Sequence, residues 1–163
     1  MEPSYERFDS EAGYRAAIDF VLAQARSSLQ VFDADLTRMQ LQTPERTALV
    51  TKFLTSNIAP QLRIVVRDND GTSDIGRRLP KLMDLLEHYS HFFSIRKAPD
   101  NLMHLADCHV IADGLHCVRR FHIDHPRGAL ISGDLAEVLP WSQRFDELWE
   151  LSKPWTGSRR LIL

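Results

Sequence analysis

The run HLADCHVIADG at residues 104–114 concentrates the side chains in this sequence that are best suited to chemistry. It holds two histidines, two aspartates and a cysteine. Imidazole, carboxylate and thiolate groups bind metal ions, and the same groups act as nucleophiles and proton carriers in enzymes. Residue types alone therefore leave three interpretations open: a metal site, an altered catalytic motif, or an ordinary strand and turn.

Strand alternation separates these side chains into two groups. On an extended strand His104 and Cys108 share one face, whereas Asp107, His109 and Asp113 share the other. His104 and Cys108 are then about 13 Å apart, which is too far for both to bind one ion. Two closer ligands on the opposite face do not complete a site. The sequence also contains no glycine-rich phosphate loop and no zinc-type cysteine spacing. We therefore expect no metal and no other cofactor.

The dipeptide Asp113-Gly114 predicts a two-residue hairpin turn. This turn would pair Ala112 with Leu115, Val110 with Cys117, Cys108 with Arg119, Asp107 with Arg120, and Ala106 with Phe121. Asp107 would then form a cross-strand ion pair with Arg120, which is a structural role. Since neither cysteine faces the other, reduced thiols are expected, in agreement with a cytoplasmic protein.

The elements that would position this hairpin alternate between helices and strands. Helices are predicted at 10–27 with Ser10 as cap, at 44–57 with Thr43 as cap, at 77–89 and at 142–152. Strands are predicted at 29–35, 62–68, 92–98 and on both sides of the turn, with an extended segment at 128–134. The pattern predicts one domain over residues 1–163, an α/β sandwich in which helices flank a mixed sheet.

Two further groups could take part in chemistry. Asp33 and Asp35 end the first predicted strand, where α/β sheets often bind ligands, but helix capping or loop solvation is the favoured explanation. The segment HIDHPRG at 122–128 carries His122 and His125 in what is predicted to be an exposed loop. On the last helix the apolar side chains of Phe145, Leu148 and Trp149 are expected to fill the core.

Composition adds weak constraints. The formal charge of −2 gives no general attraction to nucleic acid, although 16 of the 20 basic residues are arginine, whose fork suits carboxylates and phosphates. GC-rich codon usage explains the same bias. No apolar run reaches the length of a membrane span, and the first residues lack the features of a secretory signal. A cytoplasmic location is the resulting expectation.

The order of these segments resembles one half of a phospholipase D-like protein, a family that includes single-domain nucleases working as homodimers. Three segments carry the resemblance: AIDFVLAQARSSLQVFDADL; LRIVVRD followed by LPKLMDLLEHYSHFFSIRKA; and HLADCHVIADG with the late FDELWELS. Together they cover nearly the whole chain. The resemblance implies the fold of that family and a homodimer, or docking on a partner domain.

The family's catalytic motif is H-x-K-x-x-x-x-D, in which the histidine attacks phosphorus and the lysine neutralises the phosphate. Placing Asp113 on the family aspartate puts Ala106 at the histidine position and Cys108 at the lysine position. Alanine cannot form a phosphoryl intermediate, and a neutral thiol does not replace the positive charge of lysine. The alignment that starts from His104 instead places Ile111 at the aspartate position and fits less well.

The sequence thus predicts a non-catalytic phospholipase D-like binding or regulatory module, with a phosphate-bearing ligand such as a nucleotide or a nucleic-acid backbone as first candidate. The expected ligand-binding residues are His104, Cys108, Asp113 and Arg119, where Arg119 opposite Cys108 would supply the cation that the motif has lost. The alternative is an active phosphodiesterase or nuclease with a centre rebuilt from His104, His109 or His122. Exposed or ion-paired positions for these side chains remain open as well.

Overall fold

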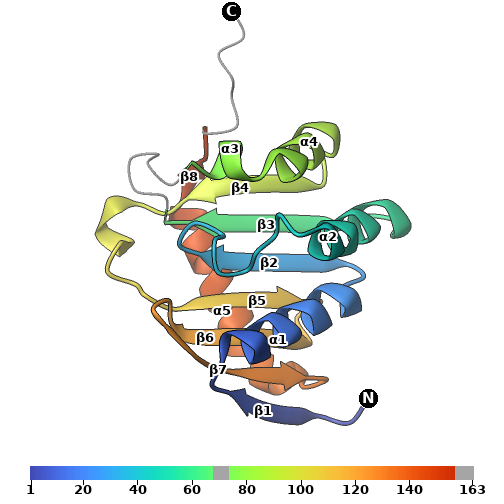
Figure 1. Ribbon diagram of the computed structural model, residues 1–163, viewed down its shortest axis with the longest axis vertical. Coiled ribbons are helices and arrows are strands. Elements are labelled where there is room, and N and C mark those ends of the chain that lie inside the picture. Colours follow the sequence, from blue (N-terminus) through green and yellow to red (C-terminus); the bar gives the residue numbers. More distant parts are fainter. Residues whose placement is uncertain (68–73, 157–163) are drawn as a thin grey trace, which may run out of the picture.

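The computed structural model describes residues 1–67 and 74–156, and in this part of the chain eight strands form one mixed sheet. The strand order across the sheet is β1-β7-β6-β5-β2-β3-β4-β8 (Figure 1). The strands are β1 Ser4–Phe8, β2 Ser28–Asp33, β3 Gln61–Val66, β4 Phe93–Lys97, β5 Cys108–Ala112, β6 His116–His122, β7 His125–Ser132 and β8 Lys153–Pro154. The pairs β2–β3 and β3–β4 are parallel, and the other neighbours are antiparallel.

Helices cover both faces of this sheet. They are α1 Glu11–Gln24, α2 Pro44–Ser56, α3 Ile75–Arg78, α4 Pro80–His88 and α5 Leu135–Leu151, with a short 3-10 turn at Asp100–Leu102. Helices α1 to α4 lie on one face, and α5 crosses behind the sheet on the other (Figure 1). We call these the α1 face and the α5 face. The predicted α/β sandwich with a mixed sheet flanked by helices is confirmed.

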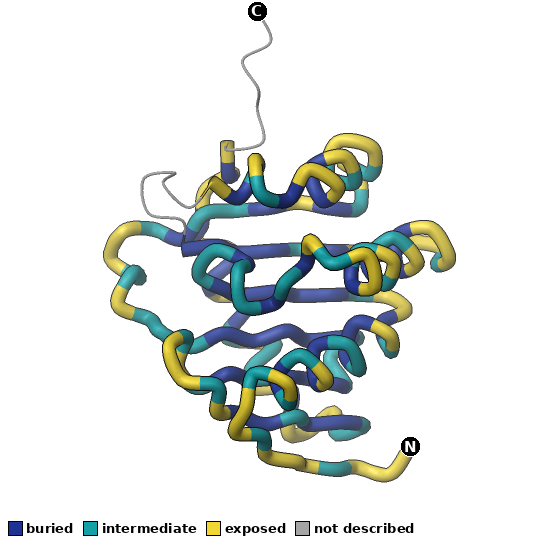
Figure 2. The backbone as a smooth tube through the Cα atoms, viewed as in Figure 1, coloured by how far each residue is buried: buried dark blue, intermediate teal, exposed yellow. Residues whose placement is uncertain are grey.

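Each face of the sheet has its own apolar core. On the α1 face, side chains such as Ile18, Leu29 and Ile64 pack between the helices and the sheet, and each is at most 1% exposed. On the α5 face, Phe32 and Val65 pack against Phe145, Leu148 and Trp149 of α5. The central strands are buried along most of their length, as the tube coloured by exposure shows (Figure 2). Since burial of both faces removes apolar surface from water, these two cores hold the sheet in place.

Local sequence signals explain most of these elements. The Ser10 hydroxyl accepts a hydrogen bond from Gly13 N and caps α1 as predicted, and Pro44 opens α2. Thr43 flanks α2 without a side-chain cap, because its hydroxyl donates to the Gln40 carbonyl instead. The helix predicted at 77–89 is divided into α3 and α4 at Pro80, whose ring cannot continue a helix. Asp68, the predicted end of the strand at 62–68, lies outside the described residues.

The segment HIDHPRG is not a loop. His122 pairs with His125 across a tight turn, so β7 begins within this segment, runs to Ser132 and then pairs with β1. Neither β1 nor the two-residue β8 was predicted, since short edge strands carry weak sequence patterns. Helix α5 begins at Leu135 rather than near residue 142, because Asp134 caps it through Glu137 N and Pro140 falls in its second turn.

The predicted hairpin register is wrong by one residue on β6. Ala112 pairs with His116, Val110 with Val118, His109 with Arg119 and Cys108 with Arg120. Asp113 and Gly114 do adopt the positive φ angles of 59° and 65° that the turn requires, and Leu115 N donates to the Ala112 carbonyl. Leu115 nevertheless belongs to the connection rather than to the strand. A shift of one residue moves every β6 side chain to the other face of the sheet.

None of the described helices is long and apolar enough to cross a membrane.

Candidate functional site

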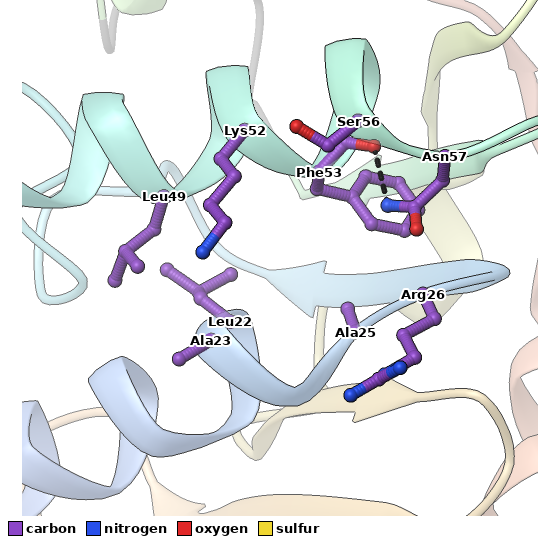
Figure 3. Close-up of a pocket in the computed structure, with 9 residues that line it drawn as sticks. All are labelled: Leu22, Ala23, Ala25, Arg26, Leu49, Lys52, Phe53, Ser56 and Asn57. Carbon is purple, nitrogen blue, oxygen red and sulfur yellow. Dashed lines mark hydrogen bonds between the residues drawn. The ribbon is translucent and has the colours of Figure 1, made fainter.

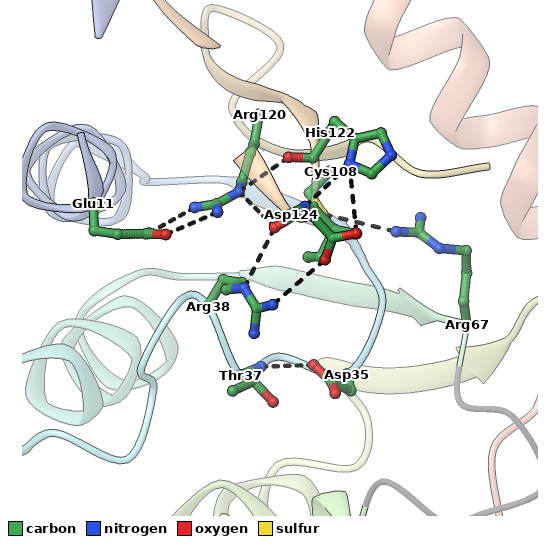
Figure 4. A network of polar contacts seen from close by, with 10 residues as sticks. Glu11, Asp35, Thr37, Arg38, Arg67, Cys108, Arg120, His122 and Asp124 are labelled. Carbon is green, nitrogen blue, oxygen red and sulfur yellow. Dashed lines mark hydrogen bonds and ion pairs between the residues drawn. The ribbon is translucent and has the colours of Figure 1, made fainter. Parts of the chain in front are cut away.

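The candidate site lies where β2 and β3 end and β5 begins. Asp33 ends β2, Arg67 directly follows β3, and Cys108 opens β5, while Arg120 of β6 pairs with Cys108 in the ladder. Figure 4 shows Arg67, Cys108 and Arg120 together with Glu11, Arg38 and Asp124 at this edge. Because the chain leaves two parallel strands here, the edge corresponds to the place where α/β sheets bind ligands.

Cys108 lies at the centre of this edge and is only 2% exposed. Arg67 Nη2 approaches its sulfur at 3.8 Å, while Arg67 Nη1 donates to the Asp107 carbonyl at 2.9 Å. Burial raises the pKa of the Cys108 thiol well above its ordinary value, and the neighbouring Asp33 raises it further. The side chain is therefore a neutral thiol at physiological pH.

Asp33 is a buried carboxyl group next to that thiol. Its Oδ2 accepts a hydrogen bond of 2.7 Å from Leu36 N, and its Oδ1 has no partner with hydrogen-bond geometry among the described residues. Burial raises the pKa of Asp33, although its interactions with Cys108 and Arg67 oppose the shift. Asp35 accepts from Thr37 N at 3.0 Å. Both aspartates therefore organise the turn after β2, and the described residues contain no group of three metal-ligating side chains.

Arg120 is fully buried and held by Glu11. Its Nη1 and Nη2 donate to the two Glu11 carboxylate oxygens at 2.7 Å and 3.0 Å, and its Nε donates to the carbonyls of His122 and Ile123. Its guanidinium also lies 4.8 Å from the centre of the Tyr14 ring. The bond from Arg120 holds the pKa of Glu11 below its ordinary value. The Arg120 guanidinium is therefore occupied by hydrogen-bond partners within the protein.

The predicted ion pair between Asp107 and Arg120 is wrong, because the register differs and Asp107 faces α5. Arg144 of α5 instead donates to both Asp107 oxygens, at 2.7 Å and 2.9 Å. Burial would raise the pKa of Asp107, but the bonds from Arg144 outweigh that effect and leave it below its ordinary value. The sequence pattern indicates no role for Arg144, although its place one helical turn before Leu148 on α5 directs it toward the sheet.

Arg119 does not share a face with Cys108, in contrast to the expectation. It pairs in the ladder with His109, and its guanidinium lies 3.5 Å from the centre of the Trp141 ring of α5 and 5.2 Å from that of Phe121. Burial lowers its pKa, yet an arginine keeps its charge at physiological pH. Arg119 is therefore a cation on the α5 face, with no carboxylate in an ion pair with it among the described residues.

The other expected ligand-binding residues also lie apart. Asp113 is at the far end of β5, where its carboxylate accepts from the backbone N–H groups of residues 26, 27 and 28 and from the Ser27 hydroxyl. His104 is exposed in the segment before β5. The structure thus does not bring His104, Cys108, Asp113 and Arg119 together into one site.

His109 is the histidine that the structure places most unexpectedly. Its ring is 1% exposed, lies among Phe32, Trp141 and Phe145, and has no hydrogen-bond partner on either nitrogen within the described residues. Burial lowers the pKa of His109 to about 3. Nothing in the residue types around it signals this environment, which depends on the position of α5.

His122 lies close to the candidate site but has its Nδ1 engaged. That atom accepts a hydrogen bond of 3.1 Å from Asp124 N, so the neutral ring carries its proton on Nε2. The lone pair on Nδ1 is the one that could attack, and it points at the backbone N–H. The His125 ring lies 5.2 Å away.

Two surface pockets lie at different places on the protein. A groove of about 290 Å³ lies between α1 and α2, with Leu22 and Phe53 at its base and Arg26 and Lys52 at its rim (Figure 3). A second pocket, of about 500 Å³, is lined by Arg7, Phe8, Asp9, Phe121, Arg127 and Gly128. The groove lies near the Asp113 end of the sheet, whereas the second pocket lies near the edge that holds Cys108.

Comparison with known proteins identifies a family to which the chain belongs and solved structures with a similar fold. A family model described as a domain of unknown function, DUF7931, matches residues 10–161. No curated protein sequence matches the chain.

Among solved structures, the chain is similar to Nuc from Salmonella typhimurium, a phospholipase D family member. The identity is 14%, the TM-score is 0.68, and the match covers 94% of this chain and 99% of Nuc. It is also similar to phosphatidylserine synthase from Haemophilus influenzae, at 14% identity and a TM-score of 0.66, over 96% of this chain and 40% of the synthase. The chain therefore has a phospholipase D-like fold.

The same fold occurs in TrmBL2, an archaeal chromatin protein whose structure shows a novel mode of DNA binding. The identity is 11% and the TM-score 0.68, over 93% of this chain and 54% of TrmBL2. This chain thus spans about half the length of that protein. At these identities the likeness concerns the fold.

Proposed function

The chain belongs to the domain family DUF7931 and has a phospholipase D-like fold. We propose that it is a non-catalytic module that binds a phosphate-bearing ligand. The proposal has two parts. The first is that the motif positions of the nucleophilic histidine and of the cationic lysine hold neither a nucleophile nor a cation. The second is that arginine side chains outside the internal ion pairs can hold a phosphate.

The state of Cys108 is the observation that carries the first part. In the alignment on Asp113, Cys108 takes the place of the motif lysine, and its thiol is buried and neutral. Ala106 takes the place of the nucleophilic histidine. A neutral thiol does not stabilise the charge that develops on a phosphoryl group, and alanine offers no lone pair for covalent attack.

The histidines favour the same interpretation over a rebuilt active centre. His109 faces α5 rather than Cys108 and is shielded from water by aromatic rings. The Nδ1 atom of His122 is engaged by Asp124 N. His104 is exposed and precedes β5. A histidine nucleophile must present a free lone pair to a phosphate that can reach it, and the buried ring of His109 and the engaged Nδ1 of His122 do not do so.

For the second part we propose Arg119 as the anchor of a phosphate site, now on the α5 face. Arg120 and Arg144 are each bound by two carboxylate oxygens. Arg119 instead rests on the Trp141 ring, which fixes its guanidinium without neutralising it. A planar cation held in this way is pre-organised to bind a phosphate oxygen.

In addition to these two parts, we propose that the chain associates through α5. Leu135 and Leu139 lie one turn apart on α5 and are 63% and 51% exposed. An apolar pair of this kind suits a second copy of the chain or a partner domain. Sedimentation of the wild type and of Leu139→Glu would test this: a dimer that dissociates in the variant supports it, and a wild-type monomer at all concentrations removes the homodimer.

Hydrolysis of bis(p-nitrophenyl) phosphate, with and without divalent metal ions, tests the catalytic part. We expect no turnover above the background of buffer for the wild type or for His104→Ala, His109→Ala and His122→Ala. Turnover in the wild type that disappears in one of these variants would establish the rebuilt active centre instead.

A calorimetric titration with pyrophosphate tests the binding part. The wild type should bind, and Arg119→Gln should bind at least about tenfold more weakly, because a charge-assisted hydrogen bond contributes about 1.5–3 kcal/mol. Arg26→Gln, in the connection between α1 and β2, is the matched control and should bind as the wild type does. Equal binding by all three proteins would remove Arg119 from the site.

A further inference from the structure

Arginine and aromatic side chains alternate at the β1 end of the sheet, near Arg119. Tyr5 and Arg7 lie on β1, Arg119 and Phe121 on β6, and Arg127 on β7. We call these five residues the Tyr5–Arg127 surface. In the ladder Arg7 pairs with Ala129, which pairs with Arg119, so Arg7 and Arg119 stand on one line across three strands. The Tyr5 phenol is close enough to Arg119 to influence its pKa.

This surface is open to solvent and hollowed at one end. Tyr5 is 51% exposed, and Arg7 and Arg127 are exposed where they line the pocket of about 500 Å³. Phe121 is half-buried in the same pocket. Phe8 and Gly128 complete the lining of the pocket. A Cβ atom at Gly128 would lie 1.9 Å from the Arg119 carbonyl oxygen and 2.5 Å from the Phe8 ring, so this position admits no side chain.

The charge of the surface is positive. Among the described residues, no carboxylate forms an ion pair with Arg7, Arg119 or Arg127, and Asp9 is the acidic residue in the lining of the pocket. The Arg7 guanidinium lies 5.8 Å from the Phe121 ring centre, near the outer limit of a cation–π contact. Little energy is therefore lost when Arg7 turns to a phosphate.

Cations interleaved with one exposed and one half-buried aromatic ring match the chemistry of a single nucleic-acid strand. Its phosphates are spaced along the backbone and attract arginine, and its unpaired bases stack on aromatic side chains. A duplex hides its bases inside the helix and offers no such stacking surface. An acidic peptide would use the arginines but not both rings.

We propose that the Tyr5–Arg127 surface binds single-stranded nucleic acid, with bases stacked on Tyr5 and Phe121 and phosphates held by Arg7, Arg119 and Arg127. This inference rests on the proposed phosphate-binding function and specifies its ligand class and its full site. It places the ligand on the opposite side of the sheet from the side chains of Cys108 and Arg120.

Fluorescence anisotropy with a labelled oligothymidylate of about 12 nucleotides tests the inference, with unlabelled inorganic polyphosphate and a DNA duplex as competitors. The wild type should bind the oligonucleotide more tightly than either competitor. Tyr5→Leu and Phe121→Leu should each weaken binding about tenfold, since stacking of one base contributes about 1–3 kcal/mol. The double variant Arg7→Gln/Arg127→Gln should lower the slope of log K against log salt by about 1.4. Arg26→Gln is the control for charge, and thermal unfolding of each variant is the control for folding.

The outcomes separate the two proposals. If polyphosphate competes as well as the oligonucleotide and the leucine variants bind normally, the stacking surface is overturned while phosphate binding stands. If the duplex binds as tightly as the single strand, the assignment to single strands is overturned. If neither the oligonucleotide, polyphosphate nor pyrophosphate binds, both proposals fail. Selective binding that the leucine variants lose, in folded proteins, supports the inference.

Discussion

Arg144 binds both carboxylate oxygens of Asp107, at 2.7 Å and 2.9 Å, and thereby fixes the start of strand β5 to helix α5. The Asp107 carbonyl is held from the other direction by Arg67 at 2.9 Å. Two arginines from different elements therefore set the backbone directly before Cys108. Functional strands are normally positioned by supporting contacts of this kind.

Replacement of Arg144 by Gln should destabilise the protein by about 1–3 kcal/mol, because it leaves a mostly buried carboxylate with weaker partners. The side chains of Arg144 and Asp107 are 27% and 21% exposed, so solvent screens the pair only in part. Urea unfolding of Arg144→Gln, Asp107→Asn and the double variant measures the coupling. Additive effects in this cycle would show that the two side chains do not stabilise each other.

Replacement of Asp113 by Ala should lower stability by about 1–2 kcal/mol, since its carboxylate satisfies backbone N–H groups between α1 and β2. Although burial raises the pKa of Asp113, hydrogen bonds from Ser28, Ser27 and Arg26 outweigh it and leave the pKa below the ordinary value. The stabilisation is present above the ordinary aspartate pKa and is lost as the pH falls through the lower, folded value. Acid unfolding curves of the wild type and Asp113→Ala should converge at low pH, and a constant separation would contradict this origin.

His109 should make the protein less stable as the pH falls from about 6.5 toward 3. Its folded pKa of about 3 lies below the ordinary 6.5, so the unfolded chain binds the proton first throughout this range. Each pH unit then removes about 1.4 kcal/mol of stability. His109→Phe, which fits the ring cluster of Phe32, Trp141 and Phe145, should remove this contribution and leave the shallower slope that the carboxylates produce. Urea unfolding at several pH values measures it, with exposed His122→Ala as control. A His109 ring that titrates near 6.5 in NMR spectra would refute the prediction.

Both thiols should resist modification in the folded protein. Cys108 and Cys117 are buried and free, and burial raises the pKa of Cys117 to about 12 and that of Cys108 well above its usual range. The reactive thiolate is therefore scarce. Ellman's reagent should react with both cysteines in urea and only slowly without it. Rapid reaction of one thiol under native conditions, lost in Cys108→Ser but not in Cys117→Ser, would show that Cys108 is accessible and ionised.

The sequence predicts the central α/β pattern because α1, α2 and the buried strands have strong local signals, such as the Ser10 cap and the apolar β3. It does not predict β1, whose five residues pair with a strand more than 100 positions away. The hairpin shows the limit most clearly. The φ angles at Asp113 and Gly114 are those that the dipeptide favours, but the residue at which pairing resumes depends on the packing of both faces.

The shift of the register by one residue also determines which side chains meet at the candidate site. It exchanges Arg119 and Arg120 between the faces of the sheet, so that the side chain expected beside Cys108 rests on Trp141, and the one expected beside Asp107 binds Glu11. Ion pairs to α1 and α5 could not be assigned from local spacing, because they depend on which face each helix covers.

The two edges of the sheet differ in a way that bears on self-association. At one edge β8 has two residues and ends in Pro154, which lacks an N–H group and blocks the approach of another strand. At the other, β1 offers a five-residue edge that carries the charges of Glu6 and Arg7. Among the described strands, β1 is therefore the edge at which a further strand could pair. Conditions that neutralise these charges should favour the first step of aggregation at the N-terminal strand.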